Sequence, residues 1–213
     1  MDERTTGLVL RLYPLTETSL IVHWLTQTVG RLSTVAKGAR RAKSPFHGKL
    51  DLFYLAELSF SRSRRSDLHT LREVRLVDPH TGLRSELGYL RQASYGAALI
   101  GQATETETPI PAIFDLMSGF LNHLPAHPPA PKTLLAFESK LLGELGLQPD
   151  LAKTRLSAGG KQLIKALAES EWRMLPRLKL SQAQVKELDQ FLHGFLVFHL
   201  GRIPPGRAAA LQG

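Results

Sequence analysis

The chain has 213 residues, 43% hydrophobic and 22% charged, which is enough to bury the core of one or two ordinary globular domains. It has 27 Lys and Arg against 19 Asp and Glu, and its net charge of +8 points to an anionic partner, nucleic acid or an acidic protein tail. The lack of Cys excludes a disulfide framework, a Cys-ligated zinc and a thiol nucleophile. There is no signal peptide and no run of 18 apolar residues, so we expect a cytoplasmic protein without a membrane partner.

Residues 1–80 carry the pattern of short strands separated by turns. Trp24, Phe53, Tyr54 and Phe60 lie within these strands, and we expect them in a core. Five strands with basic loops after the third and the fourth fit a barrel of the oligonucleotide-binding (OB) type. The count alone also fits an SH3-like barrel. Runs of β-branched and apolar residues place the strands at 6–13, 20–25, 31–36, 52–60 and 69–77.

After Pro79 the hydrophobic period changes from that of strands to that of helices. Ser181 is a suitable N-cap for the last helix, and Gly146 is a suitable stop for the third. The sequence therefore predicts an α+β protein with two domains, an OB-fold over 1–80 and an all-helical domain over 81–213. The expected helices cover 86–100, 112–124, 131–145, 163–168 and the stretch from 181 to 201.

The clearest functional signal is a cationic loop that follows the third strand. Between Arg31 and Lys49 there are six basic residues and no acidic one, so their mutual repulsion is uncompensated unless a polyanion binds. A second basic loop follows the fourth strand. A solvated loop or hairpin tip is the alternative for each. The candidate DNA-binding residues are Arg31, Lys37, Arg40, Arg41, Lys43, Arg62, Arg64 and Arg65.

Two aromatic residues at strand or loop edges, Tyr13 and Phe46, can stack on bases, as non-specific single-strand binders require, or can simply pack in the barrel. The signatures of an enzyme are absent: there is no HExxH, no P-loop and no GxSxG. Pro125 spoils the helical geometry between His123 and His127 that a shared metal would need. We expect no catalytic residue, no metal and no cofactor.

A further acidic residue, Glu107, lies with Glu105 on a loop that has no neighbouring His in the sequence. We therefore expect both carboxylates to be solvated. In the helical part, a groove lined by Leu and Phe is expected to accept an acidic, apolar-ended tail, although its cations fit an ordinary surface as well. The residues expected at its rim are Lys132, Lys140, Lys153 or Arg155.

Several segments together resemble the RecO family of bacterial recombination mediators. The most specific is Trp-Leu-Thr, three residues, then Gly-Arg-Leu-Ser-Thr-Val-Ala-Lys-Gly-Ala-Arg-Arg over 24–41, preceded by Thr-Glu-Thr-Ser-Leu-Ile over 16–21. Weaker matches are Gly-Leu-Val-Leu-Arg at 7–11, Leu-Ala-Glu-Leu at 55–58, Leu-Arg-Glu-Val at 71–74, the Phe-Glu to Gln-Pro stretch at 137–149 and His-Leu-Gly-Arg-Ile-Pro at 199–204. The resemblance is strong over 6–60 and looser beyond.

The resemblance implies binding of single- and double-stranded DNA, annealing of complementary strands, and a nucleoid-associated role in DNA repair. It also implies partnership with RecR and with the acidic C-terminal tail of single-strand-binding protein, to help load RecA indirectly. Lys37, Arg40 and Arg41 fall on the family's Lys-Gly-(any)-Arg segment.

The chain departs from the family in two places. Many members carry a four-Cys zinc module over the region of 150–175, which this Cys-free chain must replace with a shorter, metal-free segment. The second departure is Pro205-Gly206, where Lys-Ser is frequent. The alternatives that remain are an RNA-binding OB protein and a helical protein–protein adaptor.

Overall fold

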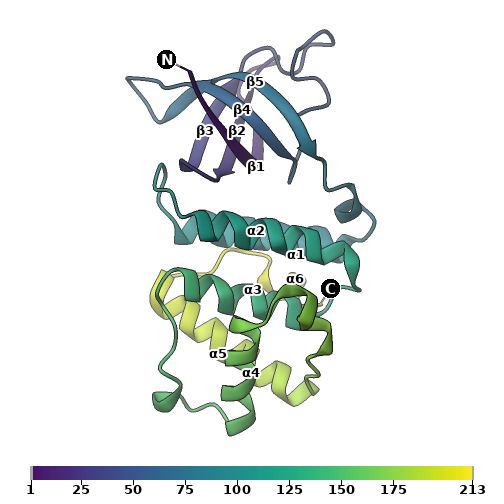
Figure 1. Ribbon diagram of the computed structural model, residues 1–213, viewed down its shortest axis with the longest axis vertical. Helices are drawn as coiled ribbons and strands as arrows, with labels where there is room; N and C mark the ends of the chain where they lie inside the picture. Colours follow the sequence, from purple (N-terminus) through teal and green to yellow (C-terminus); the bar gives the residue numbers. More distant parts are fainter. Residues whose placement is uncertain (1, 213) are drawn as a thin grey trace. The chain divides into compact units, whose positions relative to one another are not determined.

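The computed structural model describes residues 2–212, and the chain divides into two compact units (Figure 1). The barrel unit contains the chain up to Thr81 together with Thr104–Asp115. The helical unit contains Gly82–Ala103 and the chain from Leu116 onwards. The prediction of an OB-type barrel followed by helices is confirmed. The return of 104–115 to the barrel unit was not foreseen.

The barrel has five strands, β1 (Asp2–Pro14), β2 (Leu20–Thr26), β3 (Gly30–Ala36), β4 (Leu55–Ser61) and β5 (Leu68–Asp78). They close in the order β1-β2-β3-β5-β4 (Figure 1). Every neighbouring pair is antiparallel except β3 and β5, which pair in parallel over Ser33–Val35 and Leu68–Thr70. Each of the five strands therefore pairs with a neighbour on both sides over at least part of its length.

Two strand boundaries differ by more than one residue from those predicted. β1 begins at Asp2 because its first half pairs with β4, with Asp2 opposite Ser61, while its second half pairs with β2. β4 begins at Leu55 and not at residue 52, because Phe53 takes the left-handed backbone conformation with φ of 64°. That turn lets the Phe53 amide donate to the Val9 carbonyl at 2.8 Å. Alternation alone carries no signal for a left-handed residue inside an apolar run.

The barrel core is formed by residues that the strand pattern placed inward. Trp24 is fully buried, and its indole Nε1 donates to the hydroxyl of Thr34 at 2.9 Å, so its polar atom is satisfied. Phe53 and Phe60 are buried as predicted, and Tyr54 packs partly against the same cluster. Phe46 is also in the core, with 7% of its surface exposed. Of its two expected roles, barrel packing is therefore the one observed.

The helical unit is arranged around α3 (Pro131–Glu144), against which α1 (Leu87–Ala103), α4 (Ala158–Glu169), α5 (Gln182–Leu200) and α6 (Arg207–Gln212) pack. The remaining long helix, α2 (Pro111–His123), crosses the boundary between the units. Ser181 caps α5 in a capping box with Gln184, as its position predicted. The six-residue α6 was not predicted. Within residues 2–212, no helix combines the length and the apolar character needed to span a bilayer.

The segment from 168 to 178 is held by two lysines of α3 and by one aromatic residue. The ammonium of Lys140 donates to the carbonyl oxygens of Ala168, at 2.9 Å, and of Ser170. The ammonium of Lys132 donates to those of Pro176 and Leu178, both at 3.0 Å. Trp172 packs against Phe120 and His123 and lies under the Lys140 ammonium, 5.6 Å from the ring centroid.

These residues do not fit the zinc that the family resemblance implies for this region. The sequence has no Cys, and the described residues contain no group of three or more His, Cys, Asp or Glu able to hold a metal ion. Here the ammonium groups of two lysines hold the segment by donating hydrogen bonds to its carbonyl oxygens. In a four-Cys module, a zinc ion bound by thiolates would hold it instead.

A buried ion cluster fastens α6 to the rest of the helical unit. The guanidinium of Arg207 donates to Glu138 through Nε at 2.7 Å and Nη2 at 2.9 Å, and also to the carboxylate of Asp189. The Tyr95 hydroxyl donates to Glu138 at 2.7 Å, and burial raises the pKa of Tyr95. Glu138 is fully buried, and its two carboxylate oxygens accept all of these hydrogen bonds except the one to Asp189.

We expect Arg207→Leu to lower the free energy of unfolding by about 3–5 kcal/mol, because it leaves the Glu138 carboxylate buried without its partner. Arg173→Leu is the matched control, since Arg173 forms an exposed ion pair with Glu171 and should cost less than about 1 kcal/mol. Urea unfolding measures both. Equal losses in the two variants would contradict a structural role for the cluster.

His123 makes stability depend on pH, because burial, with smaller effects of His127 and Lys132, lowers its pKa to about 4. The unfolded chain takes up this proton near pH 6.5 and the folded chain does not, so stability should fall as the pH drops below 6.5. Between pH 7.5 and 5.0 the loss from this residue is about 2 kcal/mol. His123→Phe should remove that part of the loss in urea unfolding. If the free energy of unfolding depends on pH in the same way in the wild type and the variant, His123 is not the source of this pH dependence.

Candidate nucleic-acid interface

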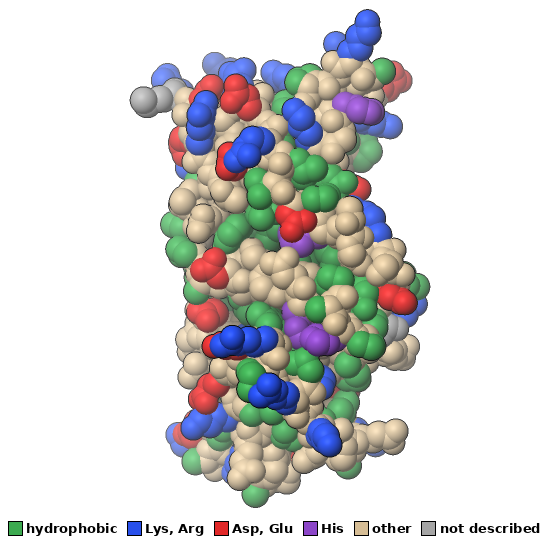
Figure 2. All heavy atoms as spheres, turned by 45° about the vertical axis from the view of Figure 1, so that its right-hand side comes forward, with side chains coloured by type: hydrophobic (Ala, Val, Ile, Leu, Met, Phe, Trp, Pro, Cys, Tyr) green, Lys and Arg blue, Asp and Glu red, His purple; other side chains and the backbone are tan. Residues whose placement is uncertain are grey.

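The first basic loop follows the last residue of β3 and is anchored at several points on the barrel. The amide of Arg40 donates to the carbonyl of Thr18 at 2.9 Å, and the buried ring of Phe46 fixes the far part of the loop. Its four cations are exposed and, among residues 2–212, form no ion pair. Figure 2 shows Lys and Arg side chains standing out from the barrel unit, at the top of the view. The four cations of the first basic loop are Lys37, Arg40, Arg41 and Lys43.

The second basic loop joins β4 to β5 and lies at a different end of the barrel. Because β5 runs parallel to β3, a loop that precedes β5 is near the beginning of β3, whereas the first basic loop follows its end. Arg64 and Arg65 are exposed and form no ion pair within the described chain. The structure therefore separates the predicted cations into two groups.

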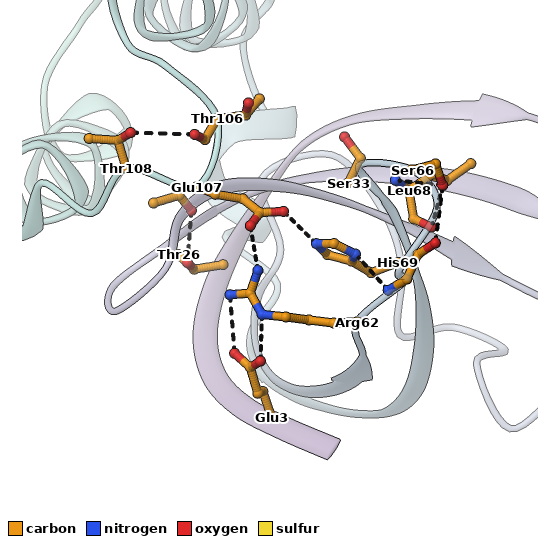
Figure 3. Close-up of polar contacts among 12 residues, drawn as sticks. Glu3, Thr26, Ser33, Arg62, Ser66, Leu68, His69, Thr106, Glu107 and Thr108 are labelled. Carbon is orange, nitrogen blue, oxygen red and sulfur yellow. Dashed lines mark hydrogen bonds and ion pairs between the residues drawn. The ribbon is translucent and has the colours of Figure 1, made fainter. Parts of the chain in front are cut away.

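Arg31 and Arg62 are brought together by the segment 104–108 rather than by either loop. Arg31 is half-buried, and it donates through Nε to the hydroxyl of Thr104 at 2.8 Å and through Nη2 to its carbonyl. Arg62 donates to Glu3 through Nε at 2.5 Å and through Nη2 at 3.2 Å, and to Glu107 through Nη1 (Figure 3). Both guanidinium groups are thus already paired within the barrel unit.

The prediction that Glu107 is solvated and lacks a His is wrong. The imidazole Nε2 of His69 lies 2.6 Å from one carboxylate oxygen of Glu107, and Arg62 contacts the other (Figure 3). Burial would raise the pKa of Glu107, but the hydrogen bonds from Arg62 and His69 outweigh it and hold that pKa below its ordinary value. His69 is 38 residues away in sequence, so only the closed barrel reveals the pair.

The outward face of β1, β2 and β3 carries a small polar and aromatic platform. Arg11, His23 and Ser33 lie opposite one another across the three strands. Tyr13 is 42% exposed and meets the His23 ring edge-on at 5.5 Å between centroids, while Arg11 donates to the Tyr13 hydroxyl at 2.9 Å. Burial, followed by the charges of Arg11 and Arg31, lowers the pKa of His23. The rings of His23 and Tyr13 therefore offer a surface on which a base can stack, next to the guanidinium of Arg11.

Of this platform, sequence analysis identified Tyr13 and overlooked Arg11 and His23. The alternation of buried and exposed positions along β2 and β3 was the available signal, because it places His23 and Ser33 on the outward face. The unbroken apolar run around His23 hid that alternation. The arrangement offers cations and ring faces, which suit binding to a phosphate backbone and to bases.

Two family profiles match the chain. The profile described as "Recombination protein O N terminal" matches residues 1–80, and "Recombination protein O C terminal" matches residues 84–157. The chain belongs to the RecO family. The resemblance predicted from the sequence is thereby confirmed. The first match covers the strands and both basic loops, whereas α4, α5 and α6 lie beyond the second.

Proteins named "DNA repair protein RecO" are among the relatives of this RecO-family chain. The one from Anaeromyxobacter dehalogenans (strain 2CP-C) is 36% identical over 148 residues, which is 70% of this chain and 58% of the relative. That from Rhodopirellula baltica is 34% identical over 143 residues, 67% of this chain and 53% of the relative. That from Myxococcus xanthus is 31% identical over 153 residues, 72% and 62% respectively. The chain thus spans little more than half the length of these relatives.

The approach of segment 104–108 to β3 requires a glycine at position 30. A Cβ on Gly30 would lie 2.2 Å from the Thr108 carbonyl oxygen, and Gly30 has a φ of 81°. We expect Gly30→Ala to cost about 2–4 kcal/mol, from the left-handed backbone and the clash together. Gly48→Ala is the control, because Gly48 has a φ of 71° and open space around it, and should cost about 1 kcal/mol. Thermal or urea unfolding that ranks them equally would contradict this packing.

Proposed function

We propose that this RecO-family chain is a non-enzymatic DNA-binding protein of DNA repair. In this proposal it binds single- and double-stranded DNA, anneals complementary strands and helps load recombinase onto DNA coated with single-strand-binding protein. The observation that carries the proposal is the first basic loop, whose four exposed cations form no ion pair among residues 2–212 and whose backbone is anchored to the barrel. The printed name of the relatives, DNA repair protein, supports the same role.

Charge neutralisation is the physical basis of the proposed DNA binding and of the proposed strand annealing. Lys and Arg side chains that contact phosphates release condensed counterions, which gives affinity that falls steeply with salt and does not depend on sequence. Two complementary strands repel each other through their phosphates. A surface that neutralises part of this charge lowers the repulsion and favours pairing without any bond-making residue. Arg64 and Arg65, at the other end of β3, supply a second group of cations for a longer strand or a second one.

The platform on β1, β2 and β3 adds contacts that phosphate neutralisation alone does not provide. Stacking of a base on an aromatic ring is sequence-tolerant and contributes about 1–3 kcal/mol per base. Tyr13 is exposed enough to offer one ring face, with Arg11 beside it. We infer that single-stranded DNA follows this face between the two basic loops.

For protein partners we propose RecR, the acidic C-terminal tail of single-strand-binding protein and, indirectly, RecA. We assign the tail to a cleft of about 380 Å³ in the helical unit, between α3 and α4. Leu142, Ile164 and Leu192 line it, and its charged lining residues are Lys140, Lys165, Glu144 and Glu169. Of the rim expected from the sequence, Lys132 and Lys140 already donate to carbonyl oxygens, and Lys153 pairs with Asp150 at 3.0 Å.

Replacing Lys37, Arg40 and Arg41 together with Ala should weaken DNA binding and annealing while leaving the fold intact, since all three are exposed. Removal of three phosphate contacts should make the slope of log affinity against log salt shallower by about 2 for single strands. Fluorescence anisotropy with labelled single-stranded DNA, duplex DNA and RNA of equal length, at several salt concentrations, measures this change.

The matched control replaces three exposed cations of the helical unit, Arg177, Lys179 and Lys186, with Ala, which removes the same total charge. It should leave the slope nearly unchanged. A folded triple variant of the loop that binds DNA as tightly as the wild type would refute the site. A strong preference for RNA would favour the RNA-binding alternative.

A further inference from the structure

The segment Thr104–Thr108 lays a glutamate into a site built of anion-binding groups. Glu107 receives one hydrogen bond from Nη1 of Arg62 and another from the imidazole of His69, on its two carboxylate oxygens (Figure 3). The other two nitrogens of the Arg62 guanidinium donate to Glu3, so Nη1 is the donor that release of Glu107 would make available. His69 is only 3% exposed, and Phe60 stacks on it with 5.4 Å between centroids, so the donor is held in place. Guanidinium and imidazole N–H groups bind phosphate oxygens as well as carboxylate oxygens.

The tautomer of His69 follows from its second hydrogen bond. The amide of Ser63 donates to Nδ1 at 3.2 Å, so Nδ1 is unprotonated and the proton is on Nε2, facing Glu107. His69 therefore donates while it is neutral. The site keeps two donors toward an anion even when the imidazole carries no charge.

Polar contacts hold Glu107 at Arg62 and His69, although its backbone conformation is unfavourable. Glu107 has a φ of 55°, in the left-handed region that residues other than glycine rarely adopt. Its amide donates to the Arg31 carbonyl at 2.7 Å, and Thr106 forms a single bridge to Arg31. Glu105, Thr106 and Thr108 are exposed. Few apolar contacts oppose the release of this segment from the barrel.

The location of the site connects it to the candidate nucleic-acid interface. Arg62 belongs to the same loop as Arg64 and Arg65, whose guanidinium groups are exposed and form no ion pair among the described residues. A DNA strand that contacts these two arginines brings its next phosphates to Arg62. At that point the phosphate and the Glu107 carboxylate compete for the same donors.

We propose that Arg62 and His69 form a phosphate-binding site for DNA that Glu107 occupies as an internal competitor in the absence of DNA. The inference rests on the proposed DNA binding and extends it. DNA displaces the carboxylate, releases the segment 104–108 from β3 and gains one further phosphate contact. Because the carboxylate must first be displaced, the affinity for this part of the strand is lower than the number of arginines suggests.

The test compares Glu107→Gln with Glu105→Gln by fluorescence anisotropy on labelled single-stranded DNA. Both changes remove one negative charge from the same segment, but only Glu107 touches Arg62 and His69. Glu107→Gln should bind about fivefold more tightly at about 0.1 M salt, because the phosphate no longer has to displace a carboxylate from Arg62 and His69. Equal effects of the two variants would overturn the proposal.

Arg62 provides the second comparison. Arg62→Gln should weaken DNA binding by the wild type, and it should abolish the gain in the double variant with Glu107→Gln. A gain that survives in the double variant would refute the site. If the wild type binds and Glu107→Gln does not differ from Glu105→Gln, this inference alone fails. If substitution of the first basic loop has no effect while the Glu107 gain is present, the proposed interface fails and this inference stands.

Hydrogen exchange supplies a readout that does not depend on affinity. The amide of Glu107, bonded to the Arg31 carbonyl, should exchange faster in the presence of saturating single-stranded DNA. The peptide covering 104–110 reports this change by mass spectrometry. Unchanged protection at saturation would show that Glu107 only fastens the segment to the barrel.

Discussion

The barrel closes through a parallel pairing of three residues on each strand, Ser33–Val35 against Leu68–Thr70, and the arrangement of the whole unit depends on this short contact. Because the pairing is parallel, the loop after β3 and the loop before β5 emerge at opposite ends. Below the pairing, the first residues of β3 have no β5 partner, and the segment 104–108 takes that place through Arg31 and Gly30. The connection between α1 and α2 is thereby part of the barrel unit.

Features set by local sequence could be predicted, and features set by closure could not. The strands, the buried Trp24 and the cap at Ser181 depend on alternation and on neighbours a few residues away. The pairing of Glu107 with His69 depends on two loops that only the closed barrel brings together. The left-handed Phe53 and the short α6 leave no periodic signal, so both escaped prediction.

The same limit applies to the basic residues. From the sequence alone, the arginines and lysines of the barrel cannot be told apart as binding residues. The sequence gives the charge of each side chain but not the groups that it contacts in the folded protein. The structure separates exposed cations such as Lys37 and Arg41, which form no ion pair with any described residue, from Arg31 and Arg62, whose guanidinium groups bind within the barrel unit. In the helical unit, Lys132 and Lys140 are likewise committed to carbonyl oxygens. Net charge therefore overstates how many cations are available to an anionic partner.

The commitment of Lys132 and Lys140 has a consequence for the conditions in which the helical unit folds. A thiolate site loses its structure when its sulfurs are oxidised or when zinc is scarce. Ammonium groups that donate to the carbonyl oxygens of residues 168–178 are exposed to neither hazard, because the sequence contains no Cys to oxidise. This part of the chain therefore keeps its arrangement without zinc and without thiols that must stay reduced.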